Sequence, residues 1–209
     1  MNTTKSLDDL AQIRSIMERS KKFLSLSPWA AILAGFYALV GAGLAYREIY
    51  RSPVVLYEQL ERGLTNPSFD TLWGIAIGVF LFAGFTALWV SYRKAQRAGE
   101  TLWSKPAIRL AVNFAIPMLA GGAFVILLFL RGYYDLLAAS TLLFYGFALL
   151  NAGNFTFSDI RNLGMSEMLV GIAALFFPGK GLFFWALGFG VLHIVYGILM
   201  YWKYERKAA

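Results

Sequence analysis

The stretch AIRLAVNFAIPMLAGGAFVILLFL, residues 107–130, decides the fold class. It has one charged side chain, Arg109, close to its beginning, and apolar residues occupy most of the remaining positions. A helix rises about 1.5 Å per residue, so roughly 20 apolar residues cross the hydrocarbon layer of a bilayer, which is about 30 Å thick. This stretch therefore predicts a transmembrane helix.

The composition of the whole chain agrees with this prediction. Hydrophobic residues make up 58% of the 209 residues and charged residues 15%, whereas soluble domains carry about 25% charged residues. The alternation of apolar and polar residues that is typical of a transmembrane barrel is absent. We therefore predict an all-α integral membrane protein.

Apolar stretches of similar length predict six transmembrane helices, over residues 28–46, 70–92, 107–130, 134–152, 158–177 and 181–203. Pro28 suits the first turn of a helix. The fifth helix is predicted to end at Phe177, Pro178 and Gly179, which form a tight turn before the sixth helix. We expect a single six-helix domain over residues 28–209, preceded by a separate segment, residues 1–27.

Lysine and arginine residues are distributed unevenly between the two ends of these helices. In this topology 14 of the 19 basic residues lie on one side, and the other five are Arg47, Arg51, Arg62, Arg131 and Lys180. The positive-inside rule therefore predicts cytoplasmic N- and C-termini. Five of the six tryptophans lie near helix ends, as in an aromatic belt: Trp29, Trp73, Trp89, Trp185 and Trp202. Because the net charge of +7 arises beside the helices, we do not expect a nucleic-acid partner.

Two further segments have helical patterns outside the predicted spans. Residues 6–26 predict a cytoplasmic amphipathic helix, since Leu10, Ile13, Met17 and Leu24 repeat at helical spacing. It would lie on the membrane surface, or dock onto the protein's own loops or onto a cytoplasmic protein partner. Residues 52–62 predict a short helix at the outer face.

Small residues mark the faces on which membrane helices approach closely. In the first predicted span such a stripe contains Gly35, and in the last span His193 lies on a stripe with Gly190. Gly74 and Gly78 form a GxxxG pair in the second span. Packing within the chain is our interpretation of these stripes, and a homo-oligomer interface is the alternative.

The fourth and sixth predicted spans share a local pattern. GFALLNAG (146–153) and GVLHIVYG (190–197) both have glycines seven residues apart, a pattern that allows three helix-hairpin repeats. With Gly171 and the turn at Pro178 and Gly179, the last hairpin resembles the repeat of the acid-resistance membrane protein family HdeD. That resemblance implies a small six-span protein of the bacterial inner membrane. The whole chain also resembles bacterial six-span membrane proteins, a resemblance that implies no activity.

Polar residues gather near the cytoplasmic ends of the third, fourth and fifth predicted spans. We predict a polar site formed by Glu167, Arg109, Asn113, Asn151 and Arg161, with His193 deeper in the membrane. A buried charge at membrane depth requires a partner, and Arg109 or Arg161 is the expected partner of Glu167. One interpretation is a hydrogen-bonded latch between the last two hairpins. The other is a cavity, open to the cytoplasm, that binds a small polar solute or passes protons.

His193 is the only histidine of the chain. We expect its imidazole to donate to a backbone carbonyl or to Asn151, and a proton relay is the alternative. The chain has no cysteine and lacks the HExxH, GxSxG and GxGxxG motifs, so we predict no catalytic residues, no metal site and no cofactor. The expected function is a non-enzymatic structural, stress-related or partner-binding component in contact with membrane lipids. The alternative is a small transporter or proton-coupled channel.

Overall fold

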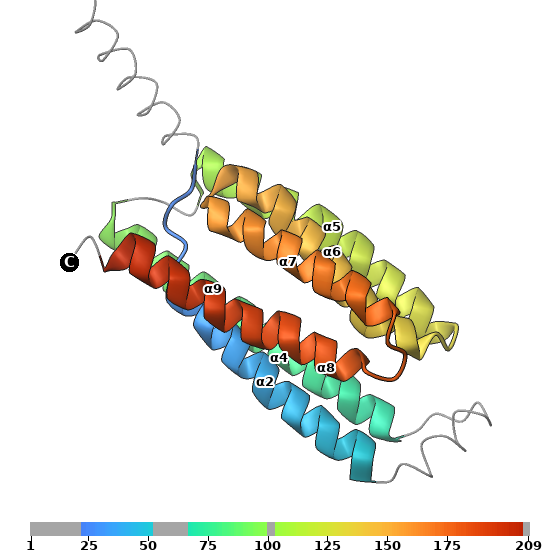
Figure 1. Cartoon of the computed structure of the whole chain (residues 1–209). Helices are drawn as coiled ribbons and strands as arrows, with labels where there is room; N and C mark the ends of the chain where they lie inside the picture. Colours follow the sequence, from blue (N-terminus) through green and yellow to red (C-terminus); the bar gives the residue numbers. More distant parts are fainter. Residues whose placement is uncertain (1–21, 52–66, 100–102, 207–209) are drawn as a thin grey trace, which may run out of the picture.

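The protein is a bundle of long helices (Figure 1), described here from a computed structural model over residues 22–51, 67–99 and 103–206. The predicted helices over residues 6–21 and 52–62 lie outside the described residues. The five longest elements are α2 (Pro28–Arg51), α4 (Pro67–Arg97), α5 (Lys105–Leu130), α6 (Leu137–Ala152) and α7 (Ser158–Leu175). Short 3₁₀ helices, η1 (Tyr134–Leu136) and η2 (Gly153–Phe155), flank α6.

The chain ends in a further continuous helix, residues 181–205, which we call the last helix. Its four segments are α8 (Gly181–Trp185), the π-helix η3 (Ala186–Leu192), α9 (His193–Met200) and the π-helix η4 (Tyr201–Glu205). A π-helix is rare, and it is frequently found at functional sites. The sequence predicts this helix but not its two π-helical segments.

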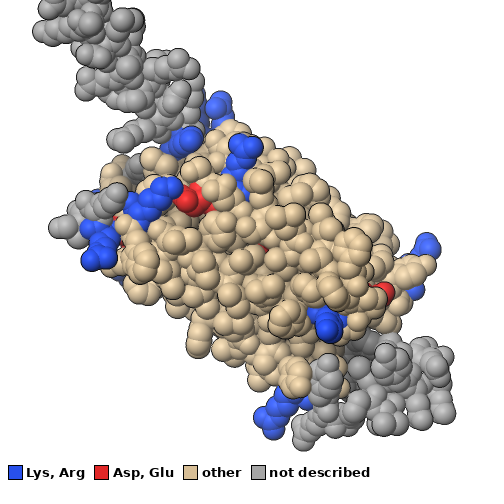
Figure 2. All heavy atoms as spheres, in the orientation of Figure 1, with Lys and Arg blue, Asp and Glu red and all other residues tan. Residues whose placement is uncertain are grey.

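Five helices of the described part are long and apolar enough to cross a membrane: Pro28–Ile49, Thr71–Arg97, Lys105–Leu130, Tyr134–Phe155 and Gly181–Glu205. They confirm a helical protein of the multi-pass membrane type. The predicted fifth span, α7, is not among them. Its 18 residues include three charged side chains, those of Asp159, Arg161 and Glu167. Figure 2 shows basic residues gathered towards the two ends of the molecule, with a broad uncharged surface between them.

The described helices lie in two groups (Figure 1). One group contains α5, α6 and α7, with α6 packed between its two neighbours in the chain. In the other group α2 lies between α4 and the last helix. The last helix also contacts α6 and α7, so it joins the two groups. The first and last helices of the bundle are therefore neighbours in space.

Glycines set the closest helix contacts in both groups. An added Cβ on Gly35 of α2 would lie 2.6 Å from the carbonyl oxygen of Gly190 in the last helix. Gly146 of α6 and Gly164 of α7 face one another in the same way, since a Cβ added to either would lie 2.7 Å from the carbonyl oxygen of the other. The predicted packing within the chain is thus confirmed for Gly35 and Gly190. Both contacts depend on backbones that approach without a side chain between them.

The GxxxG pair of α4 behaves differently. Cβ atoms added to Gly74 and Gly78 would meet no atom within 4 Å. The pair therefore makes no close helix contact within the described part of the chain. The prediction that it packs inside the molecule is wrong for these residues.

Residues 23–27 cross the end of the bundle as an extended segment. Phe23 N–H donates to the carbonyl of Phe155 over 2.8 Å, and the buried hydroxyl of Thr156 donates to the carbonyl of Phe23 over 2.7 Å. The Phe23 side chain packs with Ala95 of α4 and Ala107 of α5. The predicted amphipathic helix is therefore wrong for residues 23–26. Its backbone groups bond to the turn between α6 and α7 in place of helical partners.

Candidate functional site

The deepest acidic side chain of the bundle, that of Glu167, is fully buried at 0% exposure. Glu167 follows the first residue of α7 by nine positions, which corresponds to a rise of about 14 Å. His193 is the thirteenth of the 25 residues of the last helix, and Tyr145 is the ninth of the 16 residues of α6. All three residues lie near the midpoints of their helices, and they come from both groups.

The imidazole of His193 connects these three helices. Its Nε2 atom lies 2.8 Å from the hydroxyl of Tyr145. Its Nδ1 atom lies 3.2 Å from the carbonyl oxygen of Gly188 and also 3.2 Å from Glu167 Oε1. Because a carbonyl only accepts hydrogen bonds, Nδ1 carries a hydrogen in this arrangement. The prediction that His193 contacts a backbone carbonyl is confirmed.

The carboxyl group of Glu167 is close to the imidazole of His193 but poorly hydrogen-bonded. The 3.2 Å separation from His193 Nδ1 meets the distance of an ion pair. Neither carboxyl oxygen has a hydrogen-bond partner, and the Nδ1–H of His193 bonds to the carbonyl of Gly188. A buried polar oxygen without a hydrogen bond costs about 1–3 kcal/mol, and more when it is charged. The site therefore contains an unsatisfied buried acid.

The π-helix η3 brings the last helix against this carboxyl group. Gly188 lies in the middle of η3 and is buried. An added Cβ at this position would lie 2.5 Å from Glu167 Oε2 and would also overlap the side chain of Leu142. Only glycine leaves room for the carboxyl group here. Glycines at 188 and 190 thus serve two contacts, the first with α7 and the second with α2.

Apolar and aromatic side chains surround the pair. The ring of Tyr145 lies 5.0 Å from that of Phe189 and 6.0 Å from that of Phe114, between ring centroids. The side chain of Leu142 is completely buried. These neighbours offer no further hydrogen bonds to the carboxyl group, so the surroundings resemble the hydrocarbon of the membrane more than water.

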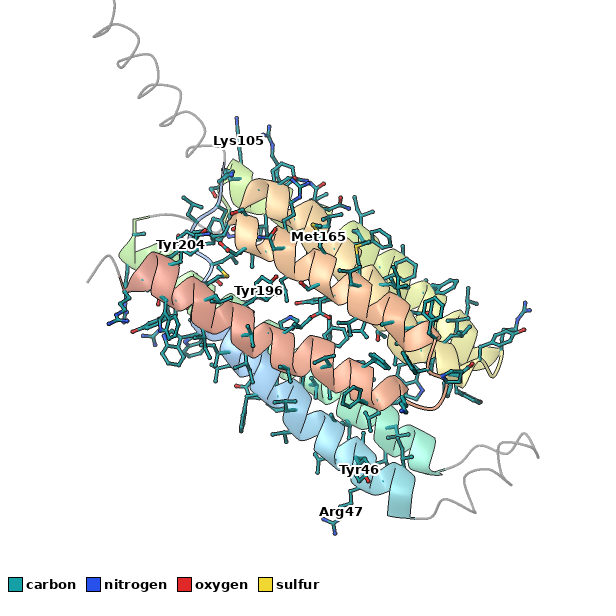
Figure 3. The ribbon with its side chains drawn as sticks, viewed as in Figure 1. Tyr46, Arg47, Lys105, Met165, Tyr196 and Tyr204 are labelled. Atoms are coloured by element: carbon teal, nitrogen blue, oxygen red, sulfur yellow. The ribbon has the colours of Figure 1, made fainter. Side chains whose placement is uncertain are left out.

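A seam of polar contacts continues from this site to one end of the bundle. The hydroxyls of Ser166 and Tyr196 lie 3.1 Å apart, and Figure 3 shows Tyr196 between the last helix and α7. Nearer the end, Asp159 accepts hydrogen bonds from Lys203 Nζ over 3.0 Å and from the Tyr204 hydroxyl over 2.5 Å. We call these contacts, together with Glu167 and His193, the polar seam. It joins α7 to the last helix along half of their length.

The remaining predicted site residues do not join Glu167. The side chains of Arg109, Arg161 and Asn151 are exposed, and that of Asn113 donates to the carbonyl of Arg109 over 2.8 Å within α5. The prediction that Arg109 or Arg161 pairs with Glu167 is wrong, because His193 takes that place. Asn151 does not serve as the hydrogen-bond partner of His193 either.

Tyr145 and Gly188 were not predicted as site residues from the sequence. Tyr145 lies one residue before the glycine of the GFALLNAG pattern, and this position on the packed face of α6 was the available signal. Gly188 lies five residues before His193, which places it near the histidine on a helix with a wide turn. Within the described residues, no three His, Asp or Glu side chains come close enough to hold a metal ion. No family model, curated protein sequence or solved structure matches this chain.

Proposed function

We propose that this chain is a non-enzymatic membrane protein with six spans, in which α7 crosses the bilayer beside α6 and both termini face the cytoplasm. Its role is structural, stress-related or partner-binding, in the inner membrane of a bacterium. The cytoplasmic end, with the segment of residues 23–27, presents a contact surface. The resemblance of the last hairpin to the HdeD family favours this assignment.

The observation that carries the proposal is the contact between Glu167 and His193. Its two residues belong to different groups of helices, and the polar seam extends it to Asp159 and Lys203. Polar side chains that contact one another across a helix interface stabilise a membrane bundle. In contrast, the exposed polar residues Arg109, Asn151 and Arg161 lie apart from Glu167, so the residues expected to line a cytoplasmic cavity around it are not assembled there.

The test compares stability with transport in one variant. We expect Glu167→Gln to lower the midpoint of thermal unfolding in detergent, because an amide replaces the carboxyl group that lies 3.2 Å from His193 Nδ1. We expect wild-type proteoliposomes under a pH gradient to show the same proton leak as empty liposomes. A proton flux in the wild-type protein that disappears in a folded Glu167→Gln variant would overturn the structural assignment.

The second candidate is a small proton-coupled transporter, and one observation favours it. Both carboxyl oxygens of Glu167 are buried without hydrogen bonds, which a purely structural contact does not require. One proton held by the carboxyl and imidazole groups together makes the pair neutral overall, whichever group carries it. Ionisable residues inside a membrane often mark proton paths. The hydroxyl of Tyr145, on the other side of the imidazole, would be the next group on such a path.

Tyr145→Phe separates the two candidates. It removes a hydroxyl and leaves the ring, so a structural site loses one hydrogen bond, worth about 1 kcal/mol. A proton-coupled site loses the same hydrogen bond, and in addition we expect its proton flux to be reduced. Tyr37→Phe is the matched control, because it removes a tyrosine hydroxyl that bonds to Thr86 over 3.4 Å outside the polar seam.

A further inference from the structure

A cavity of about 470 Å³ opens at the end of the bundle where α2 begins and α4 ends. Its lining includes Trp29 from α2, Glu205 from the last helix, and Trp89, Arg93, Lys94 and Arg97 from α4. The cavity is separate from the site of Glu167. It lies at the same end of the molecule as the extended segment of residues 23–27.

The cationic groups in this cavity are not equivalent. Lys94 Nζ donates to Glu205 over 2.9 Å and to the carbonyl of Leu26 over 3.0 Å, so its charge is balanced within the protein. Arg93 lies over the ring of Trp89, with 5.3 Å between its guanidinium carbon and the ring centroid. No carboxylate of the described residues pairs with Arg93 or Arg97. The lining therefore has an excess of two positive charges.

The two tryptophans place this cavity at the boundary of the membrane. The side chains of Trp29 and Trp89 are about half exposed, and α4 runs from its apolar part directly into the basic residues 93–97. Indole rings concentrate at the level of the lipid headgroups. The apolar surface of α4, with Leu88 exposed at 67%, continues from the cavity towards the membrane centre.

We infer that this cavity binds the phosphate group of an anionic phospholipid. The two guanidinium groups provide planar donors that suit phosphate oxygens, and the indole rings would contact the glycerol and the upper acyl chains. Free phosphate would use only the guanidinium groups, whereas a lipid uses both surfaces. The inference goes beyond the proposed function, because it depends on the membrane location of the chain and not on the role of Glu167.

The test measures stabilisation of the purified full chain in detergent by soluble short-chain lipids. The probes are dioctanoyl phosphatidylglycerol, dioctanoyl phosphatidylcholine and sodium phosphate, each titrated while the midpoint of thermal unfolding is recorded. The test variant is Arg93→Gln with Arg97→Gln. The matched control is Lys105→Gln with Arg109→Gln, which removes the same charge from exposed side chains at the start of α5.

We expect phosphatidylglycerol to raise the unfolding midpoint of the wild-type protein and of the control. The Arg93/Arg97 variant should need at least tenfold more lipid for the same shift. Without lipid its midpoint should fall only slightly, because Arg93 loses its contact with the ring of Trp89. Equal responses of the two double variants, or equal effects of phosphatidylcholine and phosphatidylglycerol, would overturn the inference. An equal effect of sodium phosphate would assign the cavity to free phosphate. Loss of a co-purified protein, with an unchanged lipid response, would assign it to a protein partner.

Discussion

Gly188 packs against the carboxyl group of Glu167, and a Cβ at residue 188 would lie 2.5 Å from Glu167 Oε2. This relationship links the π-helical segment of the last helix to the buried acid of α7. The close approach of the two helices and the burial of the carboxyl group therefore depend on each other.

The first prediction concerns Gly188→Ala. The added methyl group overlaps Glu167 and Leu142, both fully buried, so neither side chain can move into solvent. Overpacking of this kind costs about 1–3 kcal/mol. We expect the midpoint of thermal unfolding in detergent to fall by several degrees.

Gly84→Ala is the control for this substitution. Gly84 lies in α4, and an added Cβ there meets no atom within 4 Å. Alanine also has a higher helix propensity than glycine. The unfolding midpoint of Gly84→Ala should stay the same or rise slightly, and an equal loss of stability in the two variants would contradict the packing at Gly188.

The second prediction concerns the energetic coupling of Glu167 and His193. Removal of one member of a buried pair leaves the other without compensation, whereas removal of both is milder. We expect the double variant Glu167→Gln with His193→Gln to be more stable than the sum of the two single losses predicts, by about 1 kcal/mol or more. Unfolding free energies of the four proteins, measured by denaturant titration in mixed micelles, give this coupling.

A second double-mutant cycle, on two residues that do not contact each other, supplies the reference value for the coupling energy. Lys203 pairs with Asp159, eight residues from Glu167 along α7. The effects of Glu167→Gln and Lys203→Gln should therefore add to within about 0.5 kcal/mol. If the effects of Glu167→Gln and His193→Gln add as closely as those of Glu167→Gln and Lys203→Gln, the 3.2 Å contact between Glu167 and His193 makes no net contribution to stability.

The third prediction concerns the extended segment of residues 23–27. Thr156→Val preserves the shape of the side chain but removes the donor to the buried carbonyl of Phe23. An unsatisfied buried carbonyl costs about 1–3 kcal/mol. We expect a lower unfolding midpoint and faster proteolysis on the N-terminal side of Pro28.

Thr141→Val provides the comparison for Thr156→Val. The hydroxyl of Thr141 donates to the carbonyl of Ala138 within α6, and a carbonyl inside a helix keeps its backbone hydrogen bond when that hydroxyl is lost. Proteolysis before Pro28 should then proceed at the wild-type rate. Equal acceleration in both variants would show that the Thr156 hydroxyl does not hold the segment.

The positions of the helices were largely predictable from the sequence, because the length of an apolar run fixes where a membrane helix lies. The first and last residues of the helices were less predictable. Helix α4 was expected over residues 70–92 and extends over Pro67–Arg97, because basic residues continue a helix into water without changing its geometry. Residues 23–26 fall within the helical pattern of residues 6–26, but Phe23 forms hydrogen bonds to a turn about 130 residues away. No local pattern indicates such a contact.

The contact partner of Glu167 shows a different limit of prediction from the sequence. Arg161 was predicted as the partner of Glu167 because of its charge. The two residues are six positions apart, and each residue of a helix turns by about 100°, so their side chains point roughly 120° apart around α7. Helical geometry alone could have excluded this pair. The choice of His193 and Tyr145 required knowledge of which helices are neighbours, and that depends on glycine contacts such as Gly146 with Gly164.

The fourth prediction tests whether α7 crosses the membrane. The chain has no cysteine, so single cysteines can be introduced and labelled with a membrane-impermeant maleimide. Asn154 and Lys180 lie at opposite ends of α7 and are both exposed, as are Ala98 after α4 and Tyr133 before α6. In right-side-out vesicles we expect labelling of Lys180→Cys and Tyr133→Cys, but not of Asn154→Cys or Ala98→Cys. Inside-out vesicles should give the reverse pattern, because the positive-inside rule places residues 98 and 154 in the cytoplasm.

If Asn154→Cys and Lys180→Cys were labelled from the same side, α7 would not be a span. The polar seam would then lie at the membrane surface, where the cost of burying Glu167 would need another explanation.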